Sequence, residues 1–275
     1  MSAPQEDGAP GPTRMRHGGI SGLAWGTGPF DVVYLHGALL HAHAWDQVLP
    51  RLRGPSLALD LPGHGESDWY RDGDYRLDRM AAAITEVVVG HGAPPVAVVG
   101  HSRGALVAVR VAAALGAGCR RLVLVDSDPT RPAPPEPRAI PVRAAGAFED
   151  LVEDMHRMRG ELTRDRVAAG VRRAARQRPD GTWAWRWDPA VRAVQSRAES
   201  AAGAELLRAV VCPVAVIRGT RSAAVDDGAG RRIAALTGRP VAVEELPTGH
   251  NPHTEAPALL AAAIARLLAV DAVPS

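Results

Sequence analysis

The sequence has little cysteine, few aromatic residues and no lysine. Its 275 residues include only two cysteines, Cys119 and Cys212, and neither has a neighbouring cysteine at the spacing of metal ligands. Two cysteines are too few for a disulfide framework, and a chain without lysine cannot hold a cofactor through a lysine Schiff base. Phosphate-binding glycine loops are missing as well. We therefore expect a protein of a reducing compartment that needs neither a cofactor nor a metal ion.

Long hydrophobic runs and a strong excess of one charge are missing too. The formal net charge is +2, from 32 basic and 30 acidic residues mixed along the chain, so no basic footprint for nucleic acid is present. The most apolar late segment, residues 257–270, is interrupted by Arg266 and is too short to span a bilayer. Residues 1–17 lack the apolar core of a signal peptide, and their polar composition predicts a disordered tail. We expect a soluble, cytoplasmic protein with neither a nucleic-acid partner nor a membrane partner.

Hydrophobic residues make up 46% of the sequence, which is enough for a large buried core. Short β-rich runs alternate with alanine-rich stretches, and this pattern predicts an α/β fold with a mostly parallel sheet flanked by helices. We expect strands at residues 31–35, 56–60, 95–100, 121–126, 214–218 and 241–246, and helices at residues 44–52, 76–89, 103–115, 228–236 and 256–268.

The alternation breaks once, between residues 132 and 207. This segment is first rich in proline, then charged and helical, without a convincing buried strand. Because the sheet pattern resumes near Val211, the break predicts an inserted, mainly helical cap. The expected division is a tail at residues 1–17, core at 18–131, cap at 132–207 and core again at 208–275.

Residues 100–104, with the sequence GHSRG, match the pattern G-x-S-x-G. They follow an apolar strand and precede an alanine-rich helix, which is the context that a nucleophile elbow requires. The two glycines let the strand and the helix approach closely, so the Ser102 hydroxyl projects at a helix N-terminus, where the dipole favours developing negative charge. The pattern predicts that Ser102 is a nucleophile.

Three further motifs accompany the elbow. Residues 35–38 (LHGA) follow an early strand, residues 60–67 (DLPGHGES) form a glycine-rich loop, and residues 246–252 (LPTGHNP) lie between the last strand and the last helix. With these motifs in this order, the chain resembles the α/β-hydrolase family over nearly its whole length from about residue 18. The resemblance implies an α/β-hydrolase fold with serine hydrolase chemistry.

Carried over position by position, the resemblance makes Ser102 the nucleophile and His250 its general base. It makes the backbone N–H groups of Ala38 and Arg103 the oxyanion hole. The chemistry of these groups agrees, because a serine hydroxyl is weakly nucleophilic until an imidazole takes its proton, and a tetrahedral intermediate needs preorganised donors. His253 is a rival base on the same loop, but only His250 follows a glycine as in the family's pattern.

The family's usual acid position, after the strand that follows the cap, holds Ser222 instead of a carboxylate. Some members carry the acid at the end of the strand that follows the nucleophile helix. Asp126 stands at the carboxyl end of that strand, the edge where catalytic groups collect in open α/β sheets. We therefore expect Asp126 to be the acid. Asp128, Asp226 and Asp227 remain alternatives, as does a dyad without a carboxylate.

Trp183, Trp185 and Trp187 form a local cluster in a chain with only 4% aromatic residues. At a period of two they share one face of an extended segment. They either line a pocket for an apolar or aromatic part of a small-molecule substrate, or they anchor the cap to the body of the protein. His43, which follows the oxyanion motif, is a further candidate for substrate binding.

These features favour a serine hydrolase that cleaves a carboxylic ester, thioester or lactone of a small molecule through an acyl-enzyme. A serine nucleophile disfavours dehalogenase and epoxide hydrolase chemistry, which resemble family members with an aspartate at this position. Two alternatives stay open, because a fold does not fix a function. One is a carbon–carbon bond hydrolase or a cofactor-independent lyase or oxygenase, and the other is a ligand-binding protein without turnover.

Overall fold

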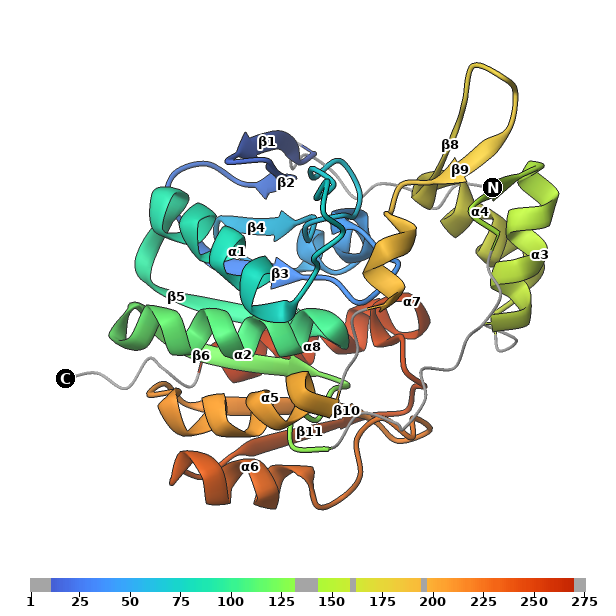
Figure 1. Cartoon of the computed structure of the whole chain (residues 1–275). Coiled ribbons are helices and arrows are strands. Elements are labelled where there is room, and N and C mark those ends of the chain that lie inside the picture. The colour runs from blue at the N-terminus through green and yellow to red at the C-terminus, as the bar shows by residue number, and fades with distance from the viewer. Residues whose placement is uncertain (1–10, 132–142, 159–161, 194–196, 270–275) are drawn as a thin grey trace.

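A central eight-stranded sheet organises the protein (Figure 1). The computed structural model describes residues 11–131, 143–158, 162–193 and 197–269. The strand order is β1-β2-β4-β3-β5-β6-β10-β11, with antiparallel pairing of β1 with β2 and of β2 with β4, and parallel pairing elsewhere. The strands are β1 (Thr13–His17), β2 (Ile20–Trp25), β3 (Phe30–Leu35), β4 (Ser56–Leu59), β5 (Gly92–His101), β6 (Cys119–Val125), β10 (Val214–Gly219) and β11 (Ala242–Leu246). The predicted fold class is confirmed.

Helices cover both faces of the sheet. Alternate residues of each inner strand point to opposite sides, so the sheet has two apolar faces to bury. Val33 and Leu35 of β3 belong to one buried cluster, whereas Val32 and Tyr34 belong to the other. The first face is covered by α1 (Leu77–His91), α2 (Arg103–Leu115), α5 (Arg197–Ala209) and α6 (Ala229–Thr237), and the second by α8 (Pro257–Ala269). Four of the five predicted helices overlap α1, α2, α6 and α8 within a few residues.

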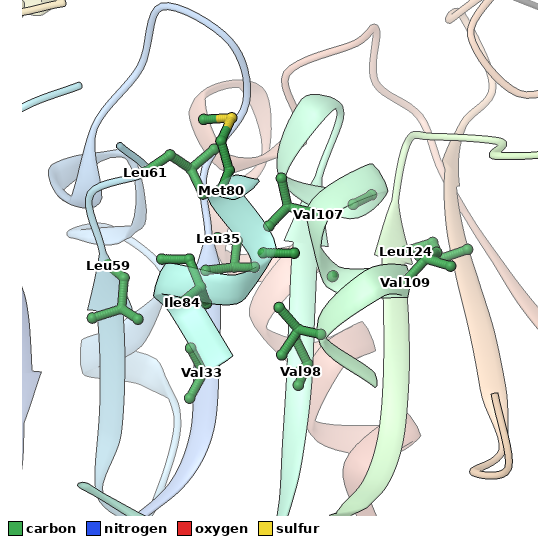
Figure 2. Packing of buried hydrophobic residues seen from close by; sticks show 14 of the residues in the cluster. Val33, Leu35, Leu59, Leu61, Met80, Ile84, Val98, Val107, Val109 and Leu124 are labelled. Atoms are coloured by element: carbon green, nitrogen blue, oxygen red, sulfur yellow. The ribbon is translucent and has the colours of Figure 1, made fainter. Parts of the chain in front are cut away.

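The first face packs tightly (Figure 2). Met80 and Ile84 of α1 and Val107 of α2 lie in one cluster with Leu35 and Val98 of the sheet, all of them buried. Full burial of such a side chain contributes roughly 1.5–3 kcal/mol relative to exposure. This packing holds the carboxyl ends of β5 and β6 side by side, and the loops that carry the candidate site begin there.

The N-terminal segment differs from the predicted tail. Thr13–His17 forms β1, which joins β2 through a two-residue turn at Gly18 and Gly19. Both glycines have positive φ, +54° and +83°, as a type I′ hairpin turn requires. The prediction of disorder is therefore wrong for residues 13–17, because the backbone ladder with β2 outweighs their polar composition. Residues 1–10 of the predicted tail lie outside the described residues.

The predicted helix at residues 44–52 is also wrong. Two short 3-10 helices, Ala42–Trp45 and Leu49–Arg51, occupy this segment. Pro50 removes a backbone donor from the second one. The side chain of Asp60 accepts the first backbone N–H of the segment at 2.6 Å, so a contact with a neighbouring loop replaces regular helix geometry.

The insertion between β6 and β10 contains more than helices. α3 (Phe148–Met158) and α4 (Arg164–Ala174) are followed by a short hairpin, β8 (Ala175–Gln177) and β9 (Trp183–Trp185). β9 also pairs with β7 (Ala145–Gly146), so these strands form a small antiparallel sheet. The sequence predicts a mainly helical cap without a convincing buried strand, and these strands of two or three residues leave almost no periodic signal. Residues 132–142, 159–161 and 194–196 of the expected cap lie outside the described residues.

The packing of α5 (Arg197–Ala209) bears on where the insertion ends, which is expected at residue 207. α5 packs against α2 and α6 (Figure 1). Its Leu207 is fully buried in the cluster that covers the sheet. We therefore propose that the cap ends before α5, which belongs to the core layer. Within the described ranges, no helix has the length and apolar character needed to cross a membrane.

Candidate active site

Ser102 lies in a strained turn between β5 and α2. Its φ of +51° and ψ of −119° fall in a region that side chains other than glycine rarely adopt. Gly100 and Gly104 make this turn possible, because a Cβ at either position would lie 2.4 Å from a backbone carbonyl oxygen. The turn holds the serine at the N-terminal end of α2, as the motif predicts.

A continuous hydrogen-bonded chain links Ser102 to a carboxylate. His250 lies in the loop between β11 and α7 (Pro252–Glu255), with Nε2 3.0 Å from Ser102 Oγ. Its Nδ1 lies 2.7 Å from Asp126 Oδ2. Because an ionised carboxylate only accepts hydrogen bonds, Nδ1 carries the proton and Nε2 is free to accept the serine hydroxyl. The arrangement can move a proton from the serine to the imidazole.

Asp126 follows β6 directly and is fully buried. Its φ of +45° turns the chain, and its own backbone N–H donates to the Ile217 carbonyl oxygen at 2.7 Å. Besides the bond to His250, Asp126 accepts the Gly219 N–H at 2.9 Å on Oδ1 and the Ser222 hydroxyl at 2.5 Å on Oδ2. Burial alone would raise the pKa of the Asp126 carboxyl, but these hydrogen bonds, led by the one from His250, lower it. The group is therefore held in its charged form.

The other candidate carboxylates point elsewhere. Arg232 binds both Asp128 and Asp226, the latter at 2.9 Å, and Asp227 pairs with Arg218. The rival base His253 is buried, with its ring 4.8 Å from the ring of His101 and 6.2 Å from the ring of Trp45, centroid to centroid. The structure therefore brings together the residues that the sequence favoured, Ser102, His250 and Asp126, and leaves their rivals in other contacts.

The predicted oxyanion residues flank the elbow. Arg103 begins α2, whose first backbone N–H groups have no acceptor within the helix. Ala38 follows Gly37, where a Cβ would lie 3.2 Å from Ser102 Cβ and 2.7 Å from His101 Nδ1. The oxyanion loop thus packs directly against the nucleophile elbow. This close approach requires glycine at position 37.

Buried polar groups fix the loops beneath the site. His36 accepts the Leu61 N–H at 3.0 Å on Nε2 and bonds the Gly37 carbonyl oxygen at 2.8 Å through Nδ1, which defines a neutral tautomer. Burial lowers the pKa of His36 well below its usual value. Asp60 accepts backbone N–H groups from Ala42 at 2.6 Å and from Glu66 at 2.9 Å. These hydrogen bonds stabilise the loops beneath the site.

The Arg103 side chain points to the insertion. It is almost fully buried, and Nη1 donates to the Val191 carbonyl oxygen at 2.5 Å. His101, on the other side of Ser102, bonds the His250 carbonyl oxygen at 2.7 Å through Nε2. The residues on both sides of the nucleophile therefore tie it to the insertion and to the histidine loop. Sequence reasoning missed the second contact, because it joins residues far apart in the chain.

A cavity of about 260 Å³ lies between the insertion and the core. His43 and Trp185 line it together with apolar residues of α3, α4 and the loop after β3, and Arg166 and Arg173 of α4 line it too. Leu39 and His253 also line it, and they neighbour the oxyanion loop and the histidine loop in the chain. Ser102 and His250 are not among its lining residues, and these two loops are what the cavity shares with the candidate site.

The three tryptophans have different surroundings. Trp185 lines the cavity, and its Nε1 donates to the Arg143 carbonyl oxygen at 2.8 Å. Trp187 is buried and stacks on Trp185 at 5.7 Å between ring centroids. Trp183 is half-buried and packs edge to face on Phe148 at 5.0 Å. One tryptophan thus faces a cavity, and the other two pack within the protein.

Sequence reasoning also missed the contribution of α4 to the cavity. Val167, Gly170, Val171 and Ala174 all line it, and their helical spacing of three and four residues was the available signal. Among the described residues, no three His, Cys, Asp or Glu side chains are grouped so that they could hold a metal ion.

Comparisons with known proteins show which family the chain is similar to. The model of the family described as "Alpha/beta hydrolase family" matches residues 32–263. The chain is 31% identical to the esterase Rv0045c of Mycobacterium tuberculosis over 78% of its own length and 74% of that protein. It is 32% identical to a pimeloyl-[acyl-carrier protein] methyl ester esterase of Chromobacterium violaceum over 76% of its own length and 82% of that protein.

A solved structure shows the same likeness in three dimensions. The crystal structure of the Rv0045c esterase superimposes with a TM-score of 0.82 at 28% identity, covering 96% of this chain and 92% of the other. The family match spans most of the sheet, the elbow and the histidine loop. On these grounds the chain belongs to the α/β-hydrolase family.

Proposed function

We propose that the protein is a serine hydrolase that cleaves a carboxylic ester of a small molecule. The observation that carries the proposal is the chain from Ser102 Oγ through His250 to Asp126, with distances of 3.0 Å and 2.7 Å. The names of the relatives, an esterase and a methyl ester esterase, support the same chemistry. Thioesters and lactones undergo the same acyl transfer and fall within the proposal.

The proposed reaction begins with attack of Ser102 Oγ on the ester carbonyl carbon while His250 Nε2 takes the serine proton. The negative charge of Asp126 stabilises the imidazolium that forms. The backbone N–H groups of Ala38 and Arg103 donate to the oxygen of the tetrahedral intermediate. His250 then gives its proton to the leaving alcohol, and an acyl-enzyme remains. Water attacks this acyl-enzyme with the same proton transfers and releases the acid.

The cavity supports a substrate with an apolar part. Leu39, Met155, Leu162 and Trp185 contribute apolar surface to it, and its volume of about 260 Å³ suits a small acyl or alcohol group. His43 lies at this cavity and is held by Asp46 at 3.0 Å. We therefore propose that His43 and Trp185 contact the substrate, whereas Trp183 and Trp187 anchor the insertion.

The proposal is tested with a fluorophosphonate probe and short activated esters. Wild-type protein is expected to hydrolyse the ester and to be labelled covalently at Ser102. Ser102→Ala should fold, lose the label and lose at least about 10³-fold in kcat, since triad members act as a unit. A folded Ser102→Ala protein with near wild-type hydrolysis would contradict the proposal. A wild-type protein that binds esters without turnover would favour a ligand-binding function.

A further inference from the structure

Ser222 occupies the position where the family's usual carboxylate is expected. Its hydroxyl donates to Asp126, the carboxylate that takes this role from another strand. Ser222 Oγ lies 2.5 Å from Asp126 Oδ2. Ser222 Oγ also accepts the Ala224 N–H at 3.1 Å. A hydroxyl has one proton, and an ionised carboxylate has none to offer. The proton of Ser222 therefore points to Asp126.

The backbone fixes this hydroxyl in place. The Ser222 N–H donates to the Gly219 carbonyl oxygen at 3.0 Å, and the Arg221 N–H donates to the Thr248 carbonyl oxygen at 2.9 Å. The Gly219 N–H itself donates to Asp126 Oδ1 at 2.9 Å. The turn after β10 thus closes around the carboxylate and supplies a donor to each of its oxygens.

Asp126 Oδ2 is shared by two side-chain donors, Ser222 at 2.5 Å and His250 at 2.7 Å. Two donors on one oxygen, with a third on Oδ1, leave the carboxylate a single orientation. The Ser222 hydroxyl also draws part of the negative charge that would otherwise act on His250. The hydroxyl therefore influences both the direction and the strength of the bond between Asp126 and His250.

We infer that Ser222 is a positioning residue, which aims Asp126 at His250 and moderates the charge that the imidazole meets. The inference rests on the proposed function, because it assigns Asp126 the role of the acid. Among the described residues, titratable and charged side chains lie beside this network. His101 packs against His250 at 5.1 Å between ring centroids, and Arg221 pairs with Glu255 at 3.1 Å.

The test compares Ser222→Ala with Ser222→Thr, which keeps the hydroxyl, on a short ester across pH. Thr130→Val is the matched control, because Thr130 Oγ1 donates at 2.6 Å to a different carboxylate, Asp128. In Ser222→Ala we expect kcat to fall roughly tenfold, because Asp126 loses a donor that fixes its orientation toward His250. The acidic limb of kcat/KM should move to higher pH by about half a unit, since the imidazolium gains charge stabilisation. Ser222→Thr and Thr130→Val should retain the wild-type profile.

A second measurement does not depend on turnover. The Nδ1 proton of His250 in histidine-labelled protein reports its bond to Asp126 by NMR, and its chemical shift should change in Ser222→Ala but not in Thr130→Val. An unchanged shift, an unchanged acidic limb, or a Thr variant that behaves like the Ala variant would overturn the inference. A change in this shift in a protein that hydrolyses no ester would overturn the proposed function and leave the positioning role standing.

Discussion

The Arg103 guanidinium donates a hydrogen bond to the carbonyl oxygen of Val191 at 2.5 Å. Arg103 is the first residue of α2 and the neighbour of Ser102, whereas Val191 lies in the insertion, in the segment after β9. The nucleophile elbow and the insertion are therefore in direct contact through a buried charged side chain. This contact is one of those that hold the insertion against the core, together with the hydrogen bond between Tyr75 and Asp188 at 2.7 Å.

Replacing Arg103 by Met should loosen the insertion and leave the chemical step largely intact. The backbone N–H at position 103 remains, so we expect KM to rise severalfold with kcat changed less than about threefold. Loss of a charge-assisted hydrogen bond should lower the free energy of unfolding by about 1.5–3 kcal/mol. Arg176→Met, at an exposed position of β8, is the control and should alter neither KM nor the free energy of unfolding. A loss confined to kcat would contradict this role.

The proposed acid lies before the insertion rather than after it. Asp126→Asn keeps the shape of the side chain but removes the charge that stabilises the imidazolium, so kcat should fall by roughly 10³ to 10⁴. Asp226→Asn and Asp227→Asn should each cost less than about tenfold, because these carboxylates pair with arginines. The kinetics of each single variant on one ester shows which of these three aspartates is the acid. An active Asp126→Asn enzyme would show that the acid is misassigned.

Buried histidines should make the fold sensitive to acid. Burial lowers the pKa of His41 and of His64 to about 3, and it lowers that of His36 well below its usual value. In the unfolded chain each of these groups takes up a proton near pH 6.5, so the unfolded state binds more protons as the pH falls from there towards 3. Stability should therefore decrease over this window, with a slope of up to about 1.4 kcal/mol per pH unit for each histidine.

Urea unfolding at pH 7.5, 6.5 and 5.5 measures this dependence. We expect the midpoint to drop between pH 6.5 and 5.5 and to change little between 7.5 and 6.5. His43 is the internal comparison, because it lies in the same loop as His41 but its side chain is half-exposed. His43→Gln should keep the slope, whereas a folded His64→Gln protein should lose part of it. Equal midpoints at all three pH values would show that these histidines are protonated without unfolding.

Much of the candidate site was predictable because two of its residues follow strands whose positions in the chain the sequence reveals. Ser102 follows β5 and Asp126 follows β6, and these parallel strands are neighbours, so their carboxyl ends meet at one edge. The apolar runs of both strands are strong signals because both faces of the sheet are covered. His250 was recognised from the loop motif around it, and the structure places it 3.0 Å from Ser102.

Other features have no comparable signal in the sequence. β1 is polar and half-exposed, and its strand structure depends on backbone pairing with β2. The bond between Ser222 and Asp126 joins residues on different loops, and no local pattern encodes a contact of that kind. α5 resembles the charged helices before it in composition, and only its packing against α2 and α6 separates it from the insertion. These are tertiary effects, which composition and periodicity do not capture.

Substitutions of the three tryptophans should differ in their effects on selectivity and stability, because the surroundings of the three side chains differ. Trp185 lines the cavity, so Trp185→Leu should change the ratio of kcat/KM between short and long acyl esters by at least severalfold. Trp183 is absent from the cavity wall and packs on Phe148, so Trp183→Leu is the matched control. It should cost roughly 1–2 kcal/mol of stability and leave the ratio unchanged.

Trp187 distinguishes packing from substrate contact. It is almost fully buried, stacks on Trp185 and does not line the cavity. Trp187→Leu should lower the free energy of unfolding by about 3 kcal/mol through lost burial, with a smaller change in selectivity than Trp185→Leu. Urea unfolding and a series of acyl esters, measured on all three variants, separate the two roles. If the three substitutions lower stability alike and none alters the ratio of kcat/KM, the tryptophans serve only as anchors and the substrate binds elsewhere.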